Sequence, residues 1–198
     1  ALGYSALLAN TEGNDNTSVG KQSLDANTTG GANVALGSSA LGANTTASNN
    51  TGIGYNALLA NTTGTRNIAI GSLAYDAADT ENDNLAIGVN ALGGAVAAGE
   101  YNVAVGNYAL DALTSADNNV AIGYEAGGAL TTGGENVIIG SYAVSTGVHT
   151  GSNNIAIGRL AGQDLTSSGN NVIMGWSAAK QATTPDDSVI IGAGACGL

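Results

Sequence analysis

Short apolar triplets recur along the whole chain at nearly constant spacing. Asn119 is followed by Val-Ala-Ile-Gly, and Asn136, seventeen residues later, is followed by Val-Ile-Ile-Gly. With the final glycine as an anchor, the phrase N-[VIL]-A-[IVL]-G-x-x-A repeats every 17 or 18 residues at Gly3, Gly20, Gly37, Gly54, Gly71, Gly88, Gly106, Gly123, Gly140, Gly158, Gly175 and Gly192. We therefore interpret residues 1–198 as a single repeat domain of about twelve coils.

Other residue types recur at fixed distances from the anchor glycine. Asn lies four residues before the anchor at Asn16, Asn33, Asn50, Asn67, Asn84, Asn102, Asn119, Asn136, Asn154 and Asn171, and Ser188 takes this position in the last phrase. Ala lies three residues after the anchor in nearly every phrase, as at Ala40 and Ala57, and Thr often lies eight residues after it, as at Thr28. The repeat is therefore a property of the complete phrase, including its turns.

A period of 17 residues is too short for a pair of packed helices, which needs more than about thirty residues. The triplets between Asn and Gly are rich in β-branched residues and alternate as a short strand does. The segments between them, such as ANTTG and LTTGGEN, are rich in turn-forming residues. The sequence thus predicts an all-β fold, a parallel β-solenoid in which each phrase forms one coil.

Stacking of the coils gives each recurring position of the phrase a structural role. Successive parallel strands lie ~4.8 Å apart, so twelve coils would form a rod on the order of 55 Å long. Stacked Asn side chains can form a hydrogen-bonded ladder. The anchor glycines fit a corner that needs positive φ or close backbone approach, and the alanines fit a narrow interior.

Both faces of each predicted strand are apolar. The middle residue, such as Ala35 or Ala104, points away from its larger neighbours, and it is replaced by Ile at Ile138, Ile173 and Ile190. A strand that is apolar on both faces needs cover on both. We expect one face to line the interior of the coil and the face of the small middle residues to contact another copy of the chain, which predicts a homo-oligomer.

The two ends predict a larger context. The chain starts with ALGYSALL, without an initiator Met or the regions of a signal peptide, and both terminal coils lack the polar caps usual in solenoids. We expect a segment of a longer or processed polypeptide, or rods that stack end to end.

Composition narrows the classes of partner. The 15 acidic and 4 basic residues give a formal charge of -11, which disfavours nucleic acid and anionic membrane surfaces. No apolar run approaches the ~20 residues that span a bilayer, so membrane insertion is not expected. The chain has no Phe and one Trp, so the core must be built from Val, Ile, Leu and Ala.

Candidate chemistry is sparse. The chain has a single histidine, His149, and a single cysteine, Cys196, so no Ser-His-Asp or Cys-His arrangement can be drawn. We therefore expect neither catalytic residues nor a cofactor. We expect His149 to be a solvated turn residue and Cys196 a small packed one. The run DAADTENDN contains four acids that would suit Ca²⁺: Asp76, Asp79, Glu81 and Asp83. Their spacing matches neither an EF-hand nor a calcium solenoid, so a solvated acidic turn is favoured over a metal site.

Aromatic and threonine positions raise two further possibilities. Tyr4, Tyr55, Tyr124 and Trp176 follow the anchor directly, and Tyr108 and Tyr142 follow one residue later. Such rings can stack on glycans, but packing at a corner or interface is favoured. Stacked Thr-Thr pairs bring ice binding into consideration, yet adjacent residues of an extended chain point in opposite directions, so turn hydrogen bonds are favoured.

The phrases NVAIG and NIAIG, followed by Ala three residues after Gly, resemble the repeats of the left-handed β-roll heads of trimeric autotransporter adhesins. The fuller phrase NNTGIGYNALLANTTGTRNIAIGSLA is similar to repeats of phage tail fibres, often placed ahead of a self-cleaving C-terminal chaperone domain. The resemblance covers the whole chain. It implies a trimeric, elongated, extracellular protein that holds or presents receptor-binding surfaces.

We therefore expect a non-enzymatic rod within a trimeric phage tail fibre or comparable virion appendage. Its partners would be further copies of itself and a cell-surface glycan or protein receptor. The alternatives are a bacterial adhesin head that binds matrix or glycan directly, a self-stacking extracellular filament subunit, and an ice-binding solenoid.

Overall fold

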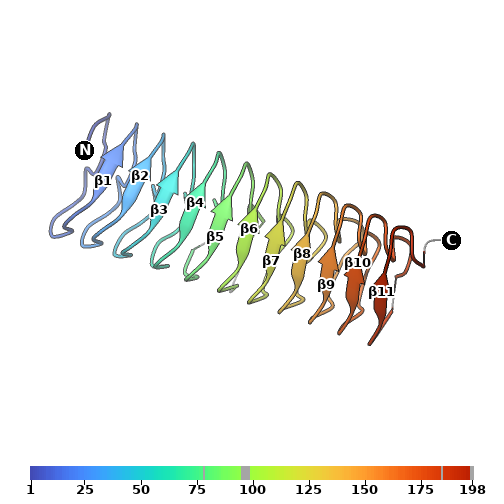
Figure 1. The fold of residues 1–198 in the computed structure, drawn as a ribbon. Coiled ribbons are helices and arrows are strands. Elements are labelled where there is room, and N and C mark those ends of the chain that lie inside the picture. The colour runs from blue at the N-terminus through green and yellow to red at the C-terminus, as the bar shows by residue number, and fades with distance from the viewer. Residues whose placement is uncertain (78, 95–98, 184, 197–198) are drawn as a thin grey trace.

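The computed structural model describes residues 1–77, 79–94, 99–183 and 185–196. Within these ranges the chain forms a β-solenoid whose strands lie side by side on one face of an elongated rod, with the two termini at opposite ends (Figure 1). The strands are β1 (Thr17–Val19), β2 (Val34–Leu36), β3 (Thr51–Ile53), β4 (Ile68–Ile70), β5 (Leu85–Ile87), β6 (Val103–Val105), β7 (Val120–Ile122), β8 (Val137–Ile139), β9 (Ile155–Ile157), β10 (Val172–Met174) and β11 (Val189–Ile191).

The strands form one parallel sheet in sequence order, β1 to β11, among the described residues. Pairing is in phase with the repeat, so that Ala69 lies beside Ala86 and Ala86 beside Ala104. The first phrase contributes only a bridge between Leu2 and Val19. The predicted all-β parallel solenoid with a period of about 17 residues is therefore confirmed.

The backbone after each strand alternates between ordinary and left-handed conformations. Positions two and four after the anchor have positive φ even when they carry a side chain: 56° at Ser39, 52° at Leu41 and 47° at the β-branched Val144. The N–H of Ser39 donates to Lys21 O in the preceding coil at 2.8 Å, and that of Leu41 donates to Ala57 O in the following coil at 2.9 Å. Hydrogen bonds to both neighbours thus offset the roughly 1–2 kcal/mol that each left-handed residue costs.

The interior of each coil is filled from the middle of its strand and from the turn that follows the anchor. Ala35, Ala69, Ala104 and Ala121 are fully buried, as are, beyond the first phrase, the leucines four residues after the anchor, such as Leu58. The expectation that the small middle residues contact another chain is therefore wrong. They point into the coil, because an interior already occupied by a leucine has room for little more than a methyl group.

Residue volumes compensate one another within a coil. Where the position four after the anchor is Gly127 or Gly162 instead of Leu, the middle of the following strand is Ile138 or Ile173. A Cβ placed on Gly127 would lie 2.7 Å from Leu110 Cδ2 and 3.2 Å from Ile138 Cδ1, and one on Gly162 would lie 2.7 Å from Leu165 Cδ1 and 3.4 Å from Ile173 Cδ1. The isoleucines that interrupt the alanine series therefore fill, together with a neighbouring leucine, the space that the glycines leave.

Candidate interaction surface

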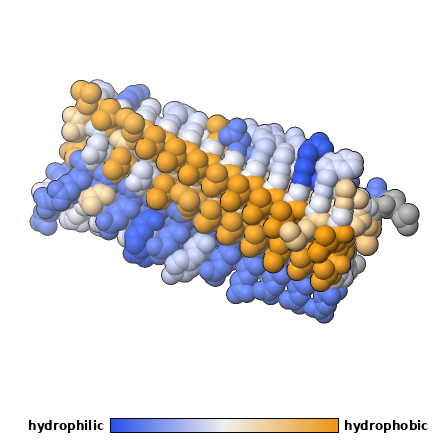
Figure 2. Space-filling model, in the orientation of Figure 1, coloured by the Kyte–Doolittle hydropathy of each residue, from blue (hydrophilic) through white to orange (hydrophobic). Residues whose placement is uncertain are grey.

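The outer face of the sheet is a continuous apolar surface, which we call the apolar stripe. It consists of the first and third residues of every strand, none of which is buried. Apart from Thr17 and Thr51, all are Val, Ile, Leu or Met. Figure 2 shows this hydrophobic band over the strands, running along the rod between hydrophilic margins.

The apolar stripe is large for a surface in contact with water. Its members include Leu36, 46% exposed, Ile122, 40% exposed, and Ile70, 37% exposed. Eleven rows at ~4.8 Å and a width of roughly 12 Å give an area on the order of 600 Å². That is at the upper limit for the largest patch on an ordinary monomer, ~300–600 Å², and approaches the ~800 Å² that each partner contributes to a standard interface.

A ladder of buried asparagines borders the stripe. Asn119 Oδ1 accepts the backbone N–H of Asn136 at 3.0 Å and its side-chain amide at 3.1 Å, and Asn102 Oδ1 receives the equivalent pair from Asn119. In the first coils the amide donates only to a carbonyl of the next coil, as from Asn33 to Ala47 O at 2.8 Å, whereas later asparagines can form both bonds, as Asn136 does with Gly151 O at 3.0 Å. These bonds satisfy polar backbone groups beside the sheet and hold successive coils in phase.

A second asparagine ladder runs through the interior of the N-terminal coils, seven residues after the anchor, and was not singled out from the sequence. The side-chain amides of Asn27 and Asn44 each donate to the asparagine of the preceding coil at 2.8 Å, and that of Asn61 donates at 3.1 Å. Leucine occupies the same phase further along, at Leu113 and Leu130. The signal was the phrase ANTTG itself, whose Asn is constant only in the first coils.

The threonine hydroxyls are used within the fold. Thr28 Oγ1 donates to Thr45 O at 3.0 Å, and Thr114 Oγ1 donates to Thr131 O at 3.0 Å. These hydroxyls satisfy carbonyl oxygens of the following coil. Because this removes their donors from the surface, the column favours the turn hydrogen bonding expected from the sequence over an array that could order water.

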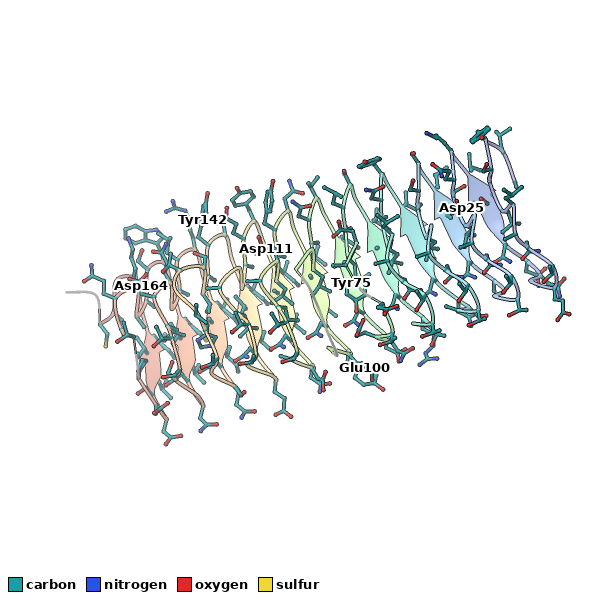
Figure 3. All side chains as sticks on the ribbon, turned by 180° about the vertical axis from the view of Figure 1, so that it is seen from behind. Asp25, Tyr75, Glu100, Asp111, Tyr142 and Asp164 are labelled. Atoms are coloured by element: carbon teal, nitrogen blue, oxygen red, sulfur yellow. The ribbon has the colours of Figure 1, made fainter. Side chains whose placement is uncertain are left out.

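Aromatic side chains gather along one edge of the rod beside the apolar stripe, where Tyr142 is labelled in Figure 3. We call this edge, formed by the first two residues after each anchor glycine, the ridge. The ring centroids of Tyr108 and Tyr124 are 6.0 Å apart, and those of Tyr124 and Tyr142 are 5.2 Å apart, both pairs edge to face. A hydrogen bond to Glu125 is the main factor that raises the pKa of Tyr124 to about 12. The three rings pack on one another rather than forming one flat platform. Tyr55 and Trp176 are exposed.

The acidic side chains of the run DAADTENDN do not converge on one site. Glu81 is 5% exposed, and its Oε2 accepts the backbone N–H groups of Asp79 at 3.0 Å and Thr80 at 3.1 Å. Asp83 forms an ion pair with Arg66, which holds the pKa of its carboxyl below the ordinary value. Burial raises the pKa of Asp76. The expectation of a wholly solvated turn is wrong for Glu81, which caps the turn from inside, and the described residues contain no cluster of three or more metal-ligating side chains.

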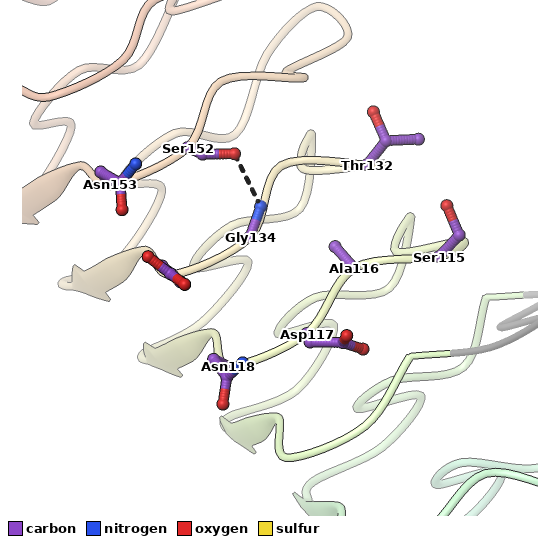
Figure 4. A pocket seen from close by; sticks show the side chains of 9 residues that line it. Ser115, Ala116, Asp117, Asn118, Thr132, Gly134, Ser152 and Asn153 are labelled. Atoms are coloured by element: carbon purple, nitrogen blue, oxygen red, sulfur yellow. Dashed lines mark hydrogen bonds between the residues drawn. The ribbon is translucent and has the colours of Figure 1, made fainter.

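One polar cleft opens opposite the ridge, where Gly134 lies between Asp117 and Ser152 of the flanking coils (Figure 4). Its volume is about 400 Å³. Ser152 Oγ accepts the Gly134 N–H at 3.0 Å, and Asp117 Oδ1 accepts the Glu100 N–H at 2.8 Å. Gly134 places no side chain in the cleft, and the open, polar walls formed by the described residues offer no catalytic arrangement.

Two residues are placed differently from expectation. His149 is fully buried instead of solvated, because its side chain turns into the coil interior beside Leu130. Cys196, expected to be packed, is exposed in the last described coil. Among the residues that the structure describes, neither lies beside a partner that would make it a nucleophile or a base.

Comparison of the chain with protein-family models, with curated proteins and with solved structures returned no match. In the described part of the chain, no helix has both the length and the apolar character needed to cross a membrane.

Proposed function

We propose that the chain is a structural, non-enzymatic rod within a trimeric phage tail fibre or comparable virion appendage, where it spaces and displays host-binding elements outside the cell. Its task would be mechanical: reach, stiffness and the fixed separation of parts along one axis. The single observation that carries this proposal is the apolar stripe, which runs along the coils of an otherwise polar rod.

The stripe supports side-by-side assembly of parallel chains. Left in water, it would expose two rows of aliphatic side chains, whereas burial of apolar area contributes roughly 25 cal/mol per Å². A second copy carries the same stripe with the same spacing along the rod, so two parallel copies match coil for coil. The net charge of -11 on each chain argues for contact through this uncharged face and against contact through the acidic margins.

The two-row form of the stripe favours three chains. In a ring of three with the axis along the rod, each chain has two neighbours and can offer one row of side chains to each of them. The first residues of the strands in one chain, such as Ile68, would pack on the third residues in the next, such as Ile70. Such a heterologous contact closes after three copies and leaves no stripe uncovered.

The first test is the mass of the native particle in dilute solution, measured by sedimentation and light scattering at several concentrations. We expect a discrete mass of three 19.1-kDa chains. A dispersed single chain would overturn the assembly and with it the fibre. An open series of masses that grows with concentration would favour the end-stacked filament instead.

A matched pair of variants localises the contact. Ile70→Glu with Ile122→Glu places charges in the middle of the stripe and should yield folded single chains, with an unchanged circular dichroism spectrum. Thr46→Glu with Thr132→Glu adds the same charge at exposed turn positions and should leave the particle intact. Equal dissociation of both variants would show that charge alone, and not the stripe, controls assembly.

A further inference from the structure

The interior of the rod contains one ionisable side chain that nothing in the described structure neutralises or pairs. His149 has no exposed surface, and neither Nδ1 nor Nε2 has a hydrogen-bond partner. A neutral imidazole has one donor and one acceptor, and both are left unsatisfied here. Buried polar groups of this kind are rare and need an explanation.

The surroundings of His149 are those of a leucine. Its backbone pairs with Leu130 of the preceding coil, and the equivalent residue of the following coil is Leu165; both leucines are fully buried. A leucine at position 149 would fill the same column without unpaired nitrogens. What histidine adds there is the ability to take up a proton.

The coil that carries His149 is also irregular. Its anchors, Gly140 and Gly158, are 18 residues apart, and the added length lies in a turn where Val148 is 62% exposed. The turn is therefore long enough for the imidazole to leave the interior while strands β8 and β9 keep their positions.

No charged neighbour opposes or assists protonation of the imidazole. Apart from Tyr142, the coil has no other ionisable side chain, and the flanking coils carry Tyr124, Glu125, Glu135, Arg159 and Asp164. None of these acts on His149, and burial lowers its pKa from 6.5 to about 4. The backbone of Thr166 and Leu165 favours the protonated ring and opposes this shift, but the smaller effect is theirs and neither residue forms a hydrogen bond of normal geometry with the imidazole. The closed coil therefore accepts the neutral ring and rejects the imidazolium.

We propose that the coil of residues 140–157 is an acid-labile joint: protonation of His149 drives its ring out of the leucine column and opens this coil while the coils on both sides stay folded. Opening remains local because each coil of a solenoid contacts only its neighbours, so the strain is not shared with the distant coils. The rod would then lose stiffness at one defined point when the pH falls.

The direction of the effect follows from the two pKa values. At pH 7.5 and above, the imidazole is almost entirely neutral in both states, and pH has little influence through this group. Between pH 6.5 and 4 the open coil binds a proton that the closed coil cannot, so closure is progressively disfavoured. The opening equilibrium constant should rise roughly 30-fold by pH 5 and more than about 100-fold by pH 4 relative to neutral pH.

The test is amide hydrogen exchange of the whole chain in its native assembly, followed by mass spectrometry at pH 7.5, 6 and 5 and corrected for the intrinsic exchange rate. We expect peptides from residues 141–156 to gain roughly 30-fold in opening between pH 7.5 and 5. Peptides from residues 17–70 should not change by more than a few-fold.

Two variants separate titration from polarity. His149→Leu restores the leucine column and should abolish the acid response. His149→Asn keeps a buried polar group without a proton to gain, and asparagine occupies the equivalent phase at Asn27 and Asn44. It should open more than His149→Leu at every pH, with no rise between pH 7.5 and 5.

Three outcomes would overturn the proposal: the same acid response in His149→Leu, uniform opening along the rod, or no response in the wild-type chain. None of these outcomes bears on the mass of the particle at neutral pH. A negative result for acid-induced opening would therefore leave the proposed rod assembly unaffected.

Discussion

Each coil turns its corner on a glycine whose φ, between 132° and 142°, is one that residues with a side chain rarely adopt. Gly71 has a φ of 142°, and a Cβ added there would lie 2.3 Å from Gly88 O in the next coil. Gly71→Ala therefore meets both a strained backbone and a hard contact, and we expect a loss of at least ~3 kcal/mol of unfolding free energy. Urea denaturation measures it, with Ser72→Ala as the adjacent control. A change below about 1 kcal/mol would show that the corner can move to accept a side chain.

The asparagine ladder makes a second prediction at single residues. Asn119→Ala removes the acceptor of the backbone N–H and the side-chain amide of Asn136, both of which are buried. Leaving buried donors unpaired costs roughly 1–3 kcal/mol each, so we expect a loss of about 2–4 kcal/mol in urea denaturation. Thr132→Ala, at an exposed position of the adjacent turn, is the control and should be neutral. Equal effects of the two variants would mean that the ladder contributes order without stability.

Within one coil, the important unit is the set of three side chains that share the interior. Gly127, Leu130 and Ile138 fill one coil, whereas Leu110, Leu113 and Ala121 fill the coil before it. Each set joins large and small residues so that the total volume changes by only about one carbon atom, as a close-packed interior requires.

Exchanging the set tests this account. Ile138→Ala alone should cost about 2–5 kcal/mol through the cavity it leaves, and Gly127→Leu alone about 1–3 kcal/mol through overpacking. The double variant reproduces the residues of the preceding coil, and leucine already adopts the required positive φ at Leu110. We therefore expect its loss to fall below ~1 kcal/mol, far from the sum of the two. Additive losses in denaturant unfolding would contradict compensation within the coil.

The sequence predicted the coil, its strand and its polar ladder because these depend on local period and on identical neighbours one repeat away. It did not predict which face of the strand points inward. Ala104 and its neighbours Val103 and Val105 are all apolar, so alternation alone cannot tell an interior that needs small residues from an interface that tolerates them. The isoleucine at 138 could have decided the matter, since it follows a glycine at 127 within the same coil.

The position of His149 was missed for a different reason. The turn STGVHTGSNN has one residue more than most of the equivalent turns. The position of His149 within the repeat is therefore ambiguous when residues are counted from the anchor glycine. Aligning Thr150 with the threonine column, instead of counting from the anchor, places His149 in the leucine phase. The backbone bond from Thr150 N–H to Thr166 O, 2.7 Å long, supports that alignment. Insertions in a repeat thus shift side-chain assignments without disturbing the strands.

At the scale of the whole rod, stability is distributed over coils that contact only their neighbours, and any one coil is replaceable by the next. Deleting residues 54–70, one complete repeat, joins Ile53 to Gly71 and keeps every column in phase. We expect this variant to fold into a rod shorter by ~4.8 Å, with its circular dichroism and cooperative unfolding retained. Small-angle scattering measures the length.

Deleting only residues 54–61 removes half as much chain but is expected to do more harm. The next strand would meet its neighbour half a coil out of phase, so the leucines, the asparagine ladder and the anchor glycines would face the wrong sides. We expect loss of the native spectrum or separation of the rod into two unequal parts. If the shorter deletion were the better tolerated, stability would follow the number of residues kept, and the register of the columns would not be what holds the coils together.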